Sequence, residues 1–159
     1  MGYAILPMVA FLFYSGLQIM GWQTANSVPG AGPVGQMQSK QVISAQQAEM
    51  WGEACYNSAS AQAGVVSSTV QVTLPAGVNA PASGGCITTA TGTGGRNIYG
   101  YIPAAPGAVG KVQGDSNENL IWYRVTQQGS AISLVSGEAV AVPNQIAVGD
   151  LVDYSTTAN

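Results

Sequence analysis

The first 22 residues of the chain read MGYAILPMVAFLFYSGLQIMGW, and no charged side chain precedes Lys40. The stretch from Tyr3 to Trp22 would form a helix about 30 Å long, which matches the hydrocarbon core of a bilayer. Its ends carry the aromatic residues that favour membrane interfaces. Pro7 lies in the first turns, where its missing N–H costs little. The sequence therefore predicts a transmembrane anchor over residues 1–22.

Gln18 is the main polar residue within this run. A glutamine inside a membrane span often hydrogen-bonds a neighbouring helix, which would indicate a protein partner in the bilayer. A position near the outer headgroups explains the residue equally well. Both interpretations stay open, and the candidate residues of this membrane or partner helix are Tyr3, Pro7, Gln18 and Trp22.

Two other interpretations compete for the same segment. A cleaved signal peptide fits less well, because a basic N-terminal region and a small-x-small cleavage site are missing. A type IV prepilin is similar in having a glycine, here Gly2, just before an apolar helix. Such a prepilin carries a glutamate five residues after the cleavage point, where this chain has Pro7. A retained anchor is therefore the leading interpretation.

The segment QTANSVPGAGPVGQ, residues 23–36, is rich in proline and glycine and predicts a linker. Residues 37–159 would then form one exported domain, since about 120 residues suffice for a single core. We expect a helix over residues 37–63, where small residues recur at spacings of three and four. One face of this helix would pack on a sheet of the same chain or dock on a partner, and it contains Ala45, Ala48, Trp51 and Gly52.

Beyond Gly64 the apolar pattern changes to the alternation that is typical of strands. Single strands are predicted for VSSTVQVTL, CITTAT, RNIYGYIP and VPNQIAVGDLVDYS, and a hairpin for LIWYRVTQ with AISLVSG. The stretch APGAVGKVQGDSNEN is either a short helix or a loop. The predicted fold class is α+β, with an N-terminal transmembrane helix and then one helix packed on a mostly antiparallel sheet, a pilin-like layout.

The two cysteines, Cys55 and Cys86, predict one disulfide if the domain is exported, and two buried thiols if it stays in the cytosol. Only 7% of the residues are charged, against about a quarter in an average protein. This composition and the cysteine pair favour an exported domain. The net charge of −3 and four scattered basic residues disfavour nucleic acid as a partner.

No constellation in the sequence predicts catalysis, a cofactor or a metal site. The stretch DSNEN opens like a calcium loop, but Leu120 and Thr126 stand where such a loop needs glycine and glutamate. Asp150 and Asp153 are expected on opposite faces of a strand, so they would not share a site. The chain has no histidine to act as a general base. We therefore expect no enzymatic activity.

Several short motifs together resemble the PilM-type proteins of type IVb pilus systems on conjugative plasmids. After the apolar N-terminus, VQVTLPAG, IYGYIPAAPGAVG, NENLIWYRVTQQGSAIS and VPNQIAVGDLVDY follow in the order of that family. The cysteine pair is not part of the family pattern. The resemblance implies an inner-membrane protein with a periplasmic domain, which takes part in the pilus basal body or in pilin transport.

These observations lead us to expect a non-enzymatic, membrane-anchored component of type IV pilus assembly. Its partners would be the lipid bilayer and other proteins of the pilus machinery, docked in the periplasm. The alternative is a pilin-like subunit of an extracellular filament, whose apolar helix packs with copies of itself in the fibre core. A membrane-anchored structural protein of a virion is a third interpretation.

Overall fold

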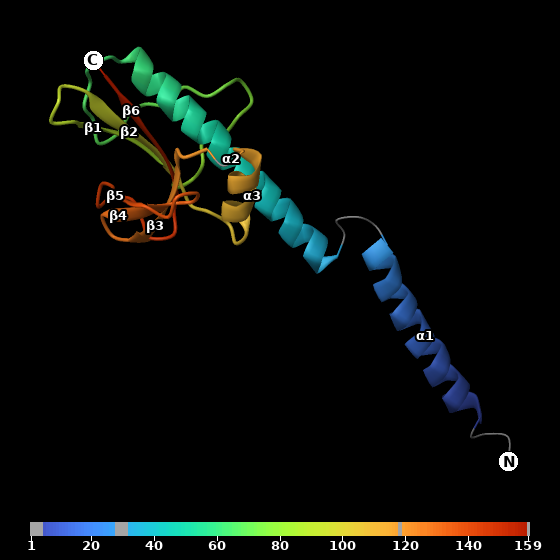
Figure 1. Ribbon diagram of the computed structural model, residues 1–159. Helices are drawn as coiled ribbons and strands as arrows, with labels where there is room; N and C mark the ends of the chain where they lie inside the picture. Colours follow the sequence, from blue (N-terminus) through green and yellow to red (C-terminus); the bar gives the residue numbers. More distant parts are fainter. Residues whose placement is uncertain (1–4, 28–31, 118, 159) are drawn as a thin grey trace. The chain divides into compact units, whose positions relative to one another are not determined.

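A computed structural model describes residues 5–27, 32–117 and 119–158, and in the first helix it describes the side chains of residues 8–21. The chain divides into two compact units, Met1–Lys40 and Gln41–Asn159. The helix α1 (Ile5–Ser27) lies in the first unit (Figure 1). Its polar Ser15 hydroxyl donates to the carbonyl oxygen of Phe11 at 2.8 Å, so this group is satisfied within the helix.

The predicted transmembrane anchor over residues 1–22 is wrong. Within the described part of the chain, no helix is both long and apolar enough to cross a membrane. Ser15 and Gln18 interrupt the apolar character of α1, and its last residues, Gln23 to Ser27, are mostly polar. Tyr3 lies outside the described residues, as do the side chains of Pro7 and Trp22.

The helix α2 (Pro33–Ala61) begins earlier than the predicted residue 37 and ends two residues before the predicted 63. Proline favours the first position of a helix, because its fixed φ suits the helix and its missing N–H has no helical partner there. The proline- and glycine-rich residues 23–36 are therefore partly helical, since α1 continues to Ser27 and α2 starts at Pro33.

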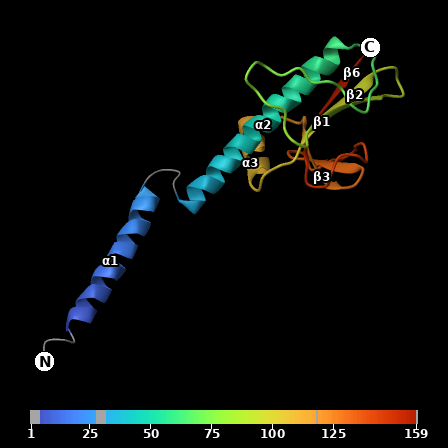
Figure 2. The same ribbon diagram turned by 180° about the vertical axis from the view of Figure 1, so that it is seen from behind.

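The second unit is a curled antiparallel sheet of six strands, against which α2 and the short helix α3 (Ala108–Asp115) are packed (Figures 1 and 2). The order across the sheet is β1-β2-β6-β3-β4-β5. The last strand in the sequence thus lies in the middle and joins two earlier groups of strands. The strands are β1 (Gly85–Ala90), β2 (Arg96–Ile102), β3 (Trp122–Gln127), β4 (Ser130–Ser133), β5 (Ala139–Ala141) and β6 (Leu151–Thr157).

The predicted strand VSSTVQVTL, residues 66–74, is only an isolated bridge in the structure. Ser67 and Thr88 exchange two backbone hydrogen bonds, and the Val70 N–H donates to the Cys86 carbonyl at 2.8 Å. The ladder ends there because the chain turns from the edge of β1 towards α2, where the Thr73 N–H donates to the Ser58 hydroxyl at 3.0 Å. Alternation of apolar residues therefore did not suffice to make a strand here.

Both faces of β2 are covered, and none of its residues is exposed. Ile98 and Ile102 of β2 pack on the side that α2 covers, whereas Tyr99 packs on the opposite side with Val125 and Ile146. The segment between β5 and β6 supplies Ile146 and so closes the second face. The result is a core on each side of one curled sheet.

Candidate functional site

A row of register partners crosses four neighbouring strands beneath α2. Directly opposite residues of antiparallel strands project on the same face of a sheet. The row therefore presents its side chains to the helix as one line across β1, β2, β6 and β3. Its members, in that order, are Cys86, Gly100, Asp153 and Trp122.

The helix and the sheet approach each other closely where Gly52 of α2 meets this row. A Cβ atom at Gly100 would lie 3.1 Å from the Cβ of Cys55 and 3.2 Å from the Cα of Gly52. A Cβ atom at Gly52 would lie 2.9 Å from the Cβ of Asp153 and would also collide with its carboxylate. A side chain at Gly52 would collide with Asp153, and one at Gly100 would press on α2, so glycine at both positions favours the close approach of the two backbones.

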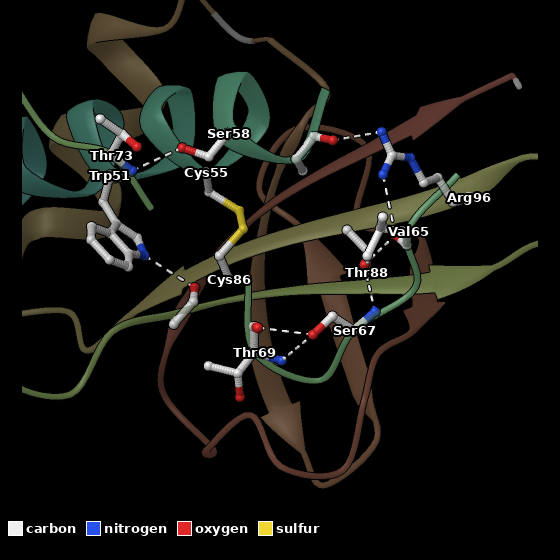
Figure 3. Close-up of a disulfide and its surroundings, with 12 residues drawn as sticks. Trp51, Cys55, Ser58, Val65, Ser67, Thr69, Thr73, Cys86, Thr88 and Arg96 are labelled. Atoms are coloured by element: carbon white, nitrogen blue, oxygen red, sulfur yellow. Dashed lines mark hydrogen bonds between the residues drawn. A yellow bond between two sulfur atoms is a disulfide. The ribbon is translucent and has the colours of Figure 1, made fainter. Parts of the chain in front are cut away.

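The predicted disulfide between Cys55 and Cys86 is confirmed, and it links α2 to β1 (Figure 3). The two Cα atoms are 5.5 Å apart, and the closed loop spans 31 residues. A loop of this length stabilises the folded state by about 3–4 kcal/mol in the chain-entropy model. The indole N–H of Trp51, one turn earlier, donates to the carbonyl of Gly85 at 3.0 Å. Both links hold α2 in register over the row.

The helix face proposed from the sequence for docking lies against the chain's own sheet. Ala45, Ala48, Trp51 and Gly52 are all buried within the second unit. Among them, Gly52 permits the close approach to Gly100. This face is therefore covered within the chain itself.

Arg96, at the start of β2, is buried with only 4% of its surface exposed. Its guanidinium donates to the carbonyl oxygens of Ala59 and Gln62 at 2.6 Å each. It also donates to the carbonyl oxygen of Val65 at 3.2 Å, and Figure 3 shows Arg96 beside Val65. The carbonyls at a helix C-terminus lack helical partners and carry partial negative charge. Arg96 therefore caps the end of α2 and fastens it to the sheet.

An acidic pocket of about 510 Å³ lies between α2, α3 and the sheet, all within the second unit. It contains four of the chain's seven acidic residues and three large apolar or aromatic side chains. No basic residue is among those that line it. The lining residues are Glu49, Glu53 and Tyr56 of α2, Asp115 and Ser116 at the end of α3, Ile121, Trp122, Asp153 and Ser155.

Asp153 is the most buried carboxylate of this pocket, with 8% of its surface exposed. No described residue donates a hydrogen bond to its side chain or forms an ion pair with it. Burial away from water raises the pKa of Asp153 to about 6. A carboxylate without a donor in such a place is costly for the fold.

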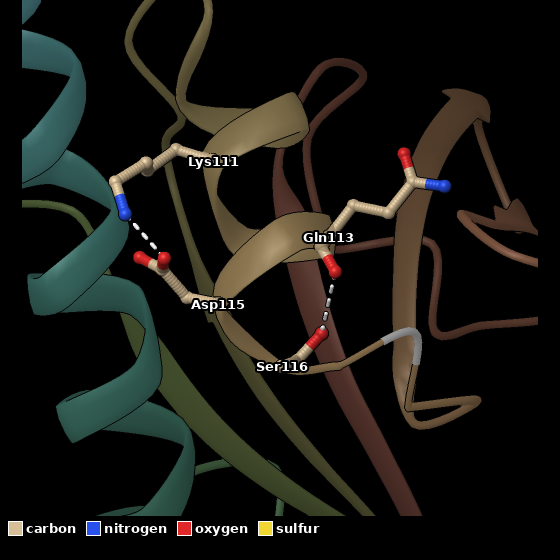
Figure 4. Close-up of polar contacts among 4 residues, drawn as sticks. All are labelled: Lys111, Gln113, Asp115 and Ser116. Atoms are coloured by element: carbon tan, nitrogen blue, oxygen red, sulfur yellow. Dashed lines mark hydrogen bonds and ion pairs between the residues drawn. The ribbon is translucent and has the colours of Figure 1, made fainter.

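The rim of the pocket holds Glu49, Asp115 and the adjacent Lys111. The Lys111 ammonium pairs with the Asp115 carboxylate within α3 (Figure 4). Burial and the negative charge of Asp115 raise the pKa of Glu49, and Lys111 partly offsets them. One carboxylate oxygen of Glu49 is buried with no hydrogen-bond partner among the described atoms. The negative charge of the pocket is therefore only partly compensated.

The geometry of the pocket does not bring enough ligands together for a metal ion. In the parts of the chain that the structure describes, no group of three or more histidine, cysteine, aspartate or glutamate residues is placed to hold one. The stretch DSNEN, which was not expected to bind calcium, contributes Asp115, and this carboxylate pairs with Lys111. Asp150 lies outside the pocket, where its carboxylate accepts the Ala147 N–H at 3.3 Å.

A second candidate surface is α1 itself. Nine large apolar side chains between Met8 and Met20 are each more than half exposed. Apolar residues in consecutive positions point to all sides of a helix rather than to one stripe. Gln18 is also exposed among them. Contiguous exposed apolar surface of this kind marks an interaction site.

Sequence reasoning missed the acidic pocket as a unit, because its carboxylates come from three separate segments. Glu49 and Glu53 are four residues apart on α2, and this spacing alone indicates a shared helix face. Their proximity to Asp115 and Asp153 follows only from the packing of α2 on the sheet. The chain matches no family model, and comparison with curated proteins and with solved structures found no match.

Proposed function

We propose that this protein is a non-enzymatic structural component of a type IV pilus-like machine, which acts by docking on other protein chains through α1. The observation that carries the proposal is the exposed apolar surface of α1 between Met8 and Met20. Nine large apolar side chains in water favour association, since each buried side chain contributes roughly 1.5–3 kcal/mol. The resemblance to PilM-type proteins supplies the kind of machine.

Export to an oxidising compartment is part of this proposal. The Cys55–Cys86 disulfide supports it, because such bonds persist in the periplasm and outside the cell and are rare in the cytosol. The partners would then be periplasmic or extracellular chains of the same machine.

A filament subunit is the second candidate, and the all-round apolar character of α1 favours it. A helix that docks in one groove needs one apolar stripe, whereas a helix at the centre of a bundle is covered on every side. Copies of α1 packed together would provide that cover. In this variant the second unit forms the outer layer of the filament.

Cell fractionation separates the two candidates. Recovery of the chain in sheared extracellular fibres would support the filament subunit and contradict an assembly component. Recovery only with cell-envelope complexes that contain other pilus proteins would support the assembly component. A chain found only as a free monomer, outside both fractions, would overturn the whole proposal.

A matched pair of substitutions tests the role of α1. Leu12→Asp places a charge on the apolar surface of α1, where Leu12 is 67% exposed. Val148→Asp makes the same kind of change at a residue that is 61% exposed in the second unit. We expect Leu12→Asp to remove the chain from its assembly, and Val148→Asp to leave it there. Equal behaviour of the two variants would contradict docking through α1.

A further inference from the structure

We propose that the acidic pocket binds an organic cation, namely the ammonium or guanidinium end of a lysine or arginine side chain from a partner protein chain. This site lies in the second unit and is separate from the apolar surface of α1, so it goes beyond the docking role proposed above. It would recognise a partner by charge, whereas α1 would do so by apolar contact.

The charge of the pocket is the first argument. Glu49, Glu53, Asp115 and Asp153 converge on about 510 Å³, and no described basic residue lines this volume, although Lys111 beside it pairs with Asp115. Like charges this close repel one another, and a cation between them would relieve that repulsion. Since no lysine or arginine lines the pocket, the cation has to come from outside it.

The buried carboxylate of Asp153 is the second and independent argument. The side chain lines the pocket, is 8% exposed and has no described hydrogen-bond or ion-pair partner. Buried carboxylates are normally paired. The packing of α2 on the sheet brings Asp153 to this position, because Gly52 has no side chain and so leaves room for the carboxylate beneath the helix. Trp122 of β3 lies directly opposite Asp153 in the sheet. The position is therefore prepared for a group that donates hydrogen bonds and carries positive charge.

The walls of the pocket indicate which cation fits. Trp122, Tyr56 and Ile121 form an apolar and aromatic lining beside the carboxylates. A lysine or arginine side chain matches this arrangement, because its aliphatic stem packs on apolar surface while its charged end reaches polar groups. Aromatic faces also attract ammonium and guanidinium groups directly. A bare metal ion gains nothing from such walls.

Titration of the full chain with short blocked peptides tests the proposal. The probe is Gly-Lys-Gly, acetylated and amidated at its ends, and the comparison peptide has norleucine in place of lysine. We expect the lysine peptide to shift the amide resonances around Asp153, Trp122 and Tyr56, and to bind at least tenfold more tightly than the norleucine peptide. Equal binding of the two peptides, or no shift at the pocket, would overturn the proposal.

Three variants locate the binding within the chain. Asp153→Asn and Glu49→Gln should each weaken binding of the lysine peptide at least fivefold, whereas Glu138→Gln should leave it unchanged. Glu138 is exposed, carries the same charge and does not line the pocket, so it controls for general attraction. Glu49 is only partly buried, so its variant folds even if Asp153→Asn does not. Equal loss in all three variants would contradict a defined site.

Butylamine, a free amine, separates a side chain from a small soluble ligand. It offers the same ammonium group and stem without a peptide backbone. Weaker binding of butylamine than of the lysine peptide would support a partner chain as the source. Tighter binding of butylamine than of the peptide would overturn the assignment to a protein side chain.

Discussion

At the scale of single residues, two buried charges have opposite effects on the second unit. Arg96 has three carbonyl acceptors at the end of α2, whereas Asp153 has no donor among the described residues. A buried charge stabilises a fold only where its hydrogen-bonding partners are present. Arg96 therefore contributes to stability, and Asp153 lowers it in the absence of a ligand.

The pH dependence of stability should report on Asp153. The pKa of Asp153 is 3.8 for an aspartate in water, which represents the unfolded chain, and burial raises it to about 6 in the folded protein. The folded state therefore binds more protons between these values, so the free energy of unfolding decreases as pH rises from about 4 to about 6. The two pKa values differ by about 2 units, which corresponds to a loss of about 3 kcal/mol.

Urea denaturation of the wild type and of Asp153→Asn between pH 3.5 and 7 measures this effect. We expect the difference in unfolding free energy between the two proteins to change by about 3 kcal/mol across that range. Burial also raises the pKa values of Glu49 and Asp150, so the variant retains a smaller decrease of the same sign. Parallel curves for the two proteins would show that Asp153 does not titrate as described.

Replacement of Arg96 should release the end of α2. We expect Arg96→Met to lower the free energy of unfolding by about 3–5 kcal/mol, because three hydrogen bonds of a buried charge are lost together while the desolvation cost of that charge offsets part of the loss. Arg96→Lys keeps the charge but loses the planar fork, so an intermediate loss is expected. Chemical denaturation at pH 7 gives the values, and a Met variant as stable as the wild type would contradict the capping role.

At the scale of elements, the packing of α2 on the sheet depends on glycine as much as on apolar side chains. Gly52 and Gly100 let the helix and β2 approach, and the Cys55–Cys86 disulfide holds them there. The atoms facing Gly100 belong to the helix backbone and to a bonded cysteine, so they cannot move aside easily.

A methyl group at Gly100 should therefore separate α2 from the sheet. We expect Gly100→Ala to lower the free energy of unfolding by about 1–3 kcal/mol, the usual cost of overpacking. Gly110→Ala is the control, since no atom lies within 4 Å of its added Cβ in α3. Alanine also favours a helix over glycine. Thermal unfolding of both variants and of the wild type measures the change in stability. A Gly100→Ala variant as stable as the wild type would contradict the close approach of α2 and β2.

At the scale of the whole molecule, the chain combines an apolar helix with a separately packed α+β unit. All three clusters of buried apolar residues lie in the second unit, Gln41–Asn159. The described residues of α1 contribute none of them. The buried core therefore lies apart from the exposed apolar surface for which we propose a docking role.

A variant that lacks residues 1–32 should still fold, because the clusters of buried apolar residues all lie within Gln41–Asn159. We expect its thermal midpoint to agree with that of the full chain within a few degrees, because no core residue is removed. Its tendency to associate should fall, since the exposed apolar helix is gone. Calorimetry and sedimentation of both proteins provide the comparison. A truncated chain that fails to unfold cooperatively would show that α1 is part of the core.

Local patterns in the sequence predicted several features of the second unit correctly. The cysteine pair, the small-residue face of α2, the β3–β4 hairpin, and strands at CITTAT and RNIYGYIP follow from residue types and short-range spacing. Residues 66–74 were predicted as a strand but form only an isolated bridge. Alternation of apolar residues does not ensure that a neighbouring strand pairs with the whole segment.

The apolar run near the N-terminus by itself predicted a helix, which the structure has as α1, but the predicted membrane span was wrong, since no described helix is long and apolar enough to cross a bilayer. Only the tertiary structure decided that Asp153 is buried without a partner and that three segments place four carboxylates in one pocket. The physical reason is distance along the chain. Helix formation and cysteine pairing depend on local composition and spacing, whereas burial and electrostatic neighbours depend on which distant segments the fold packs together.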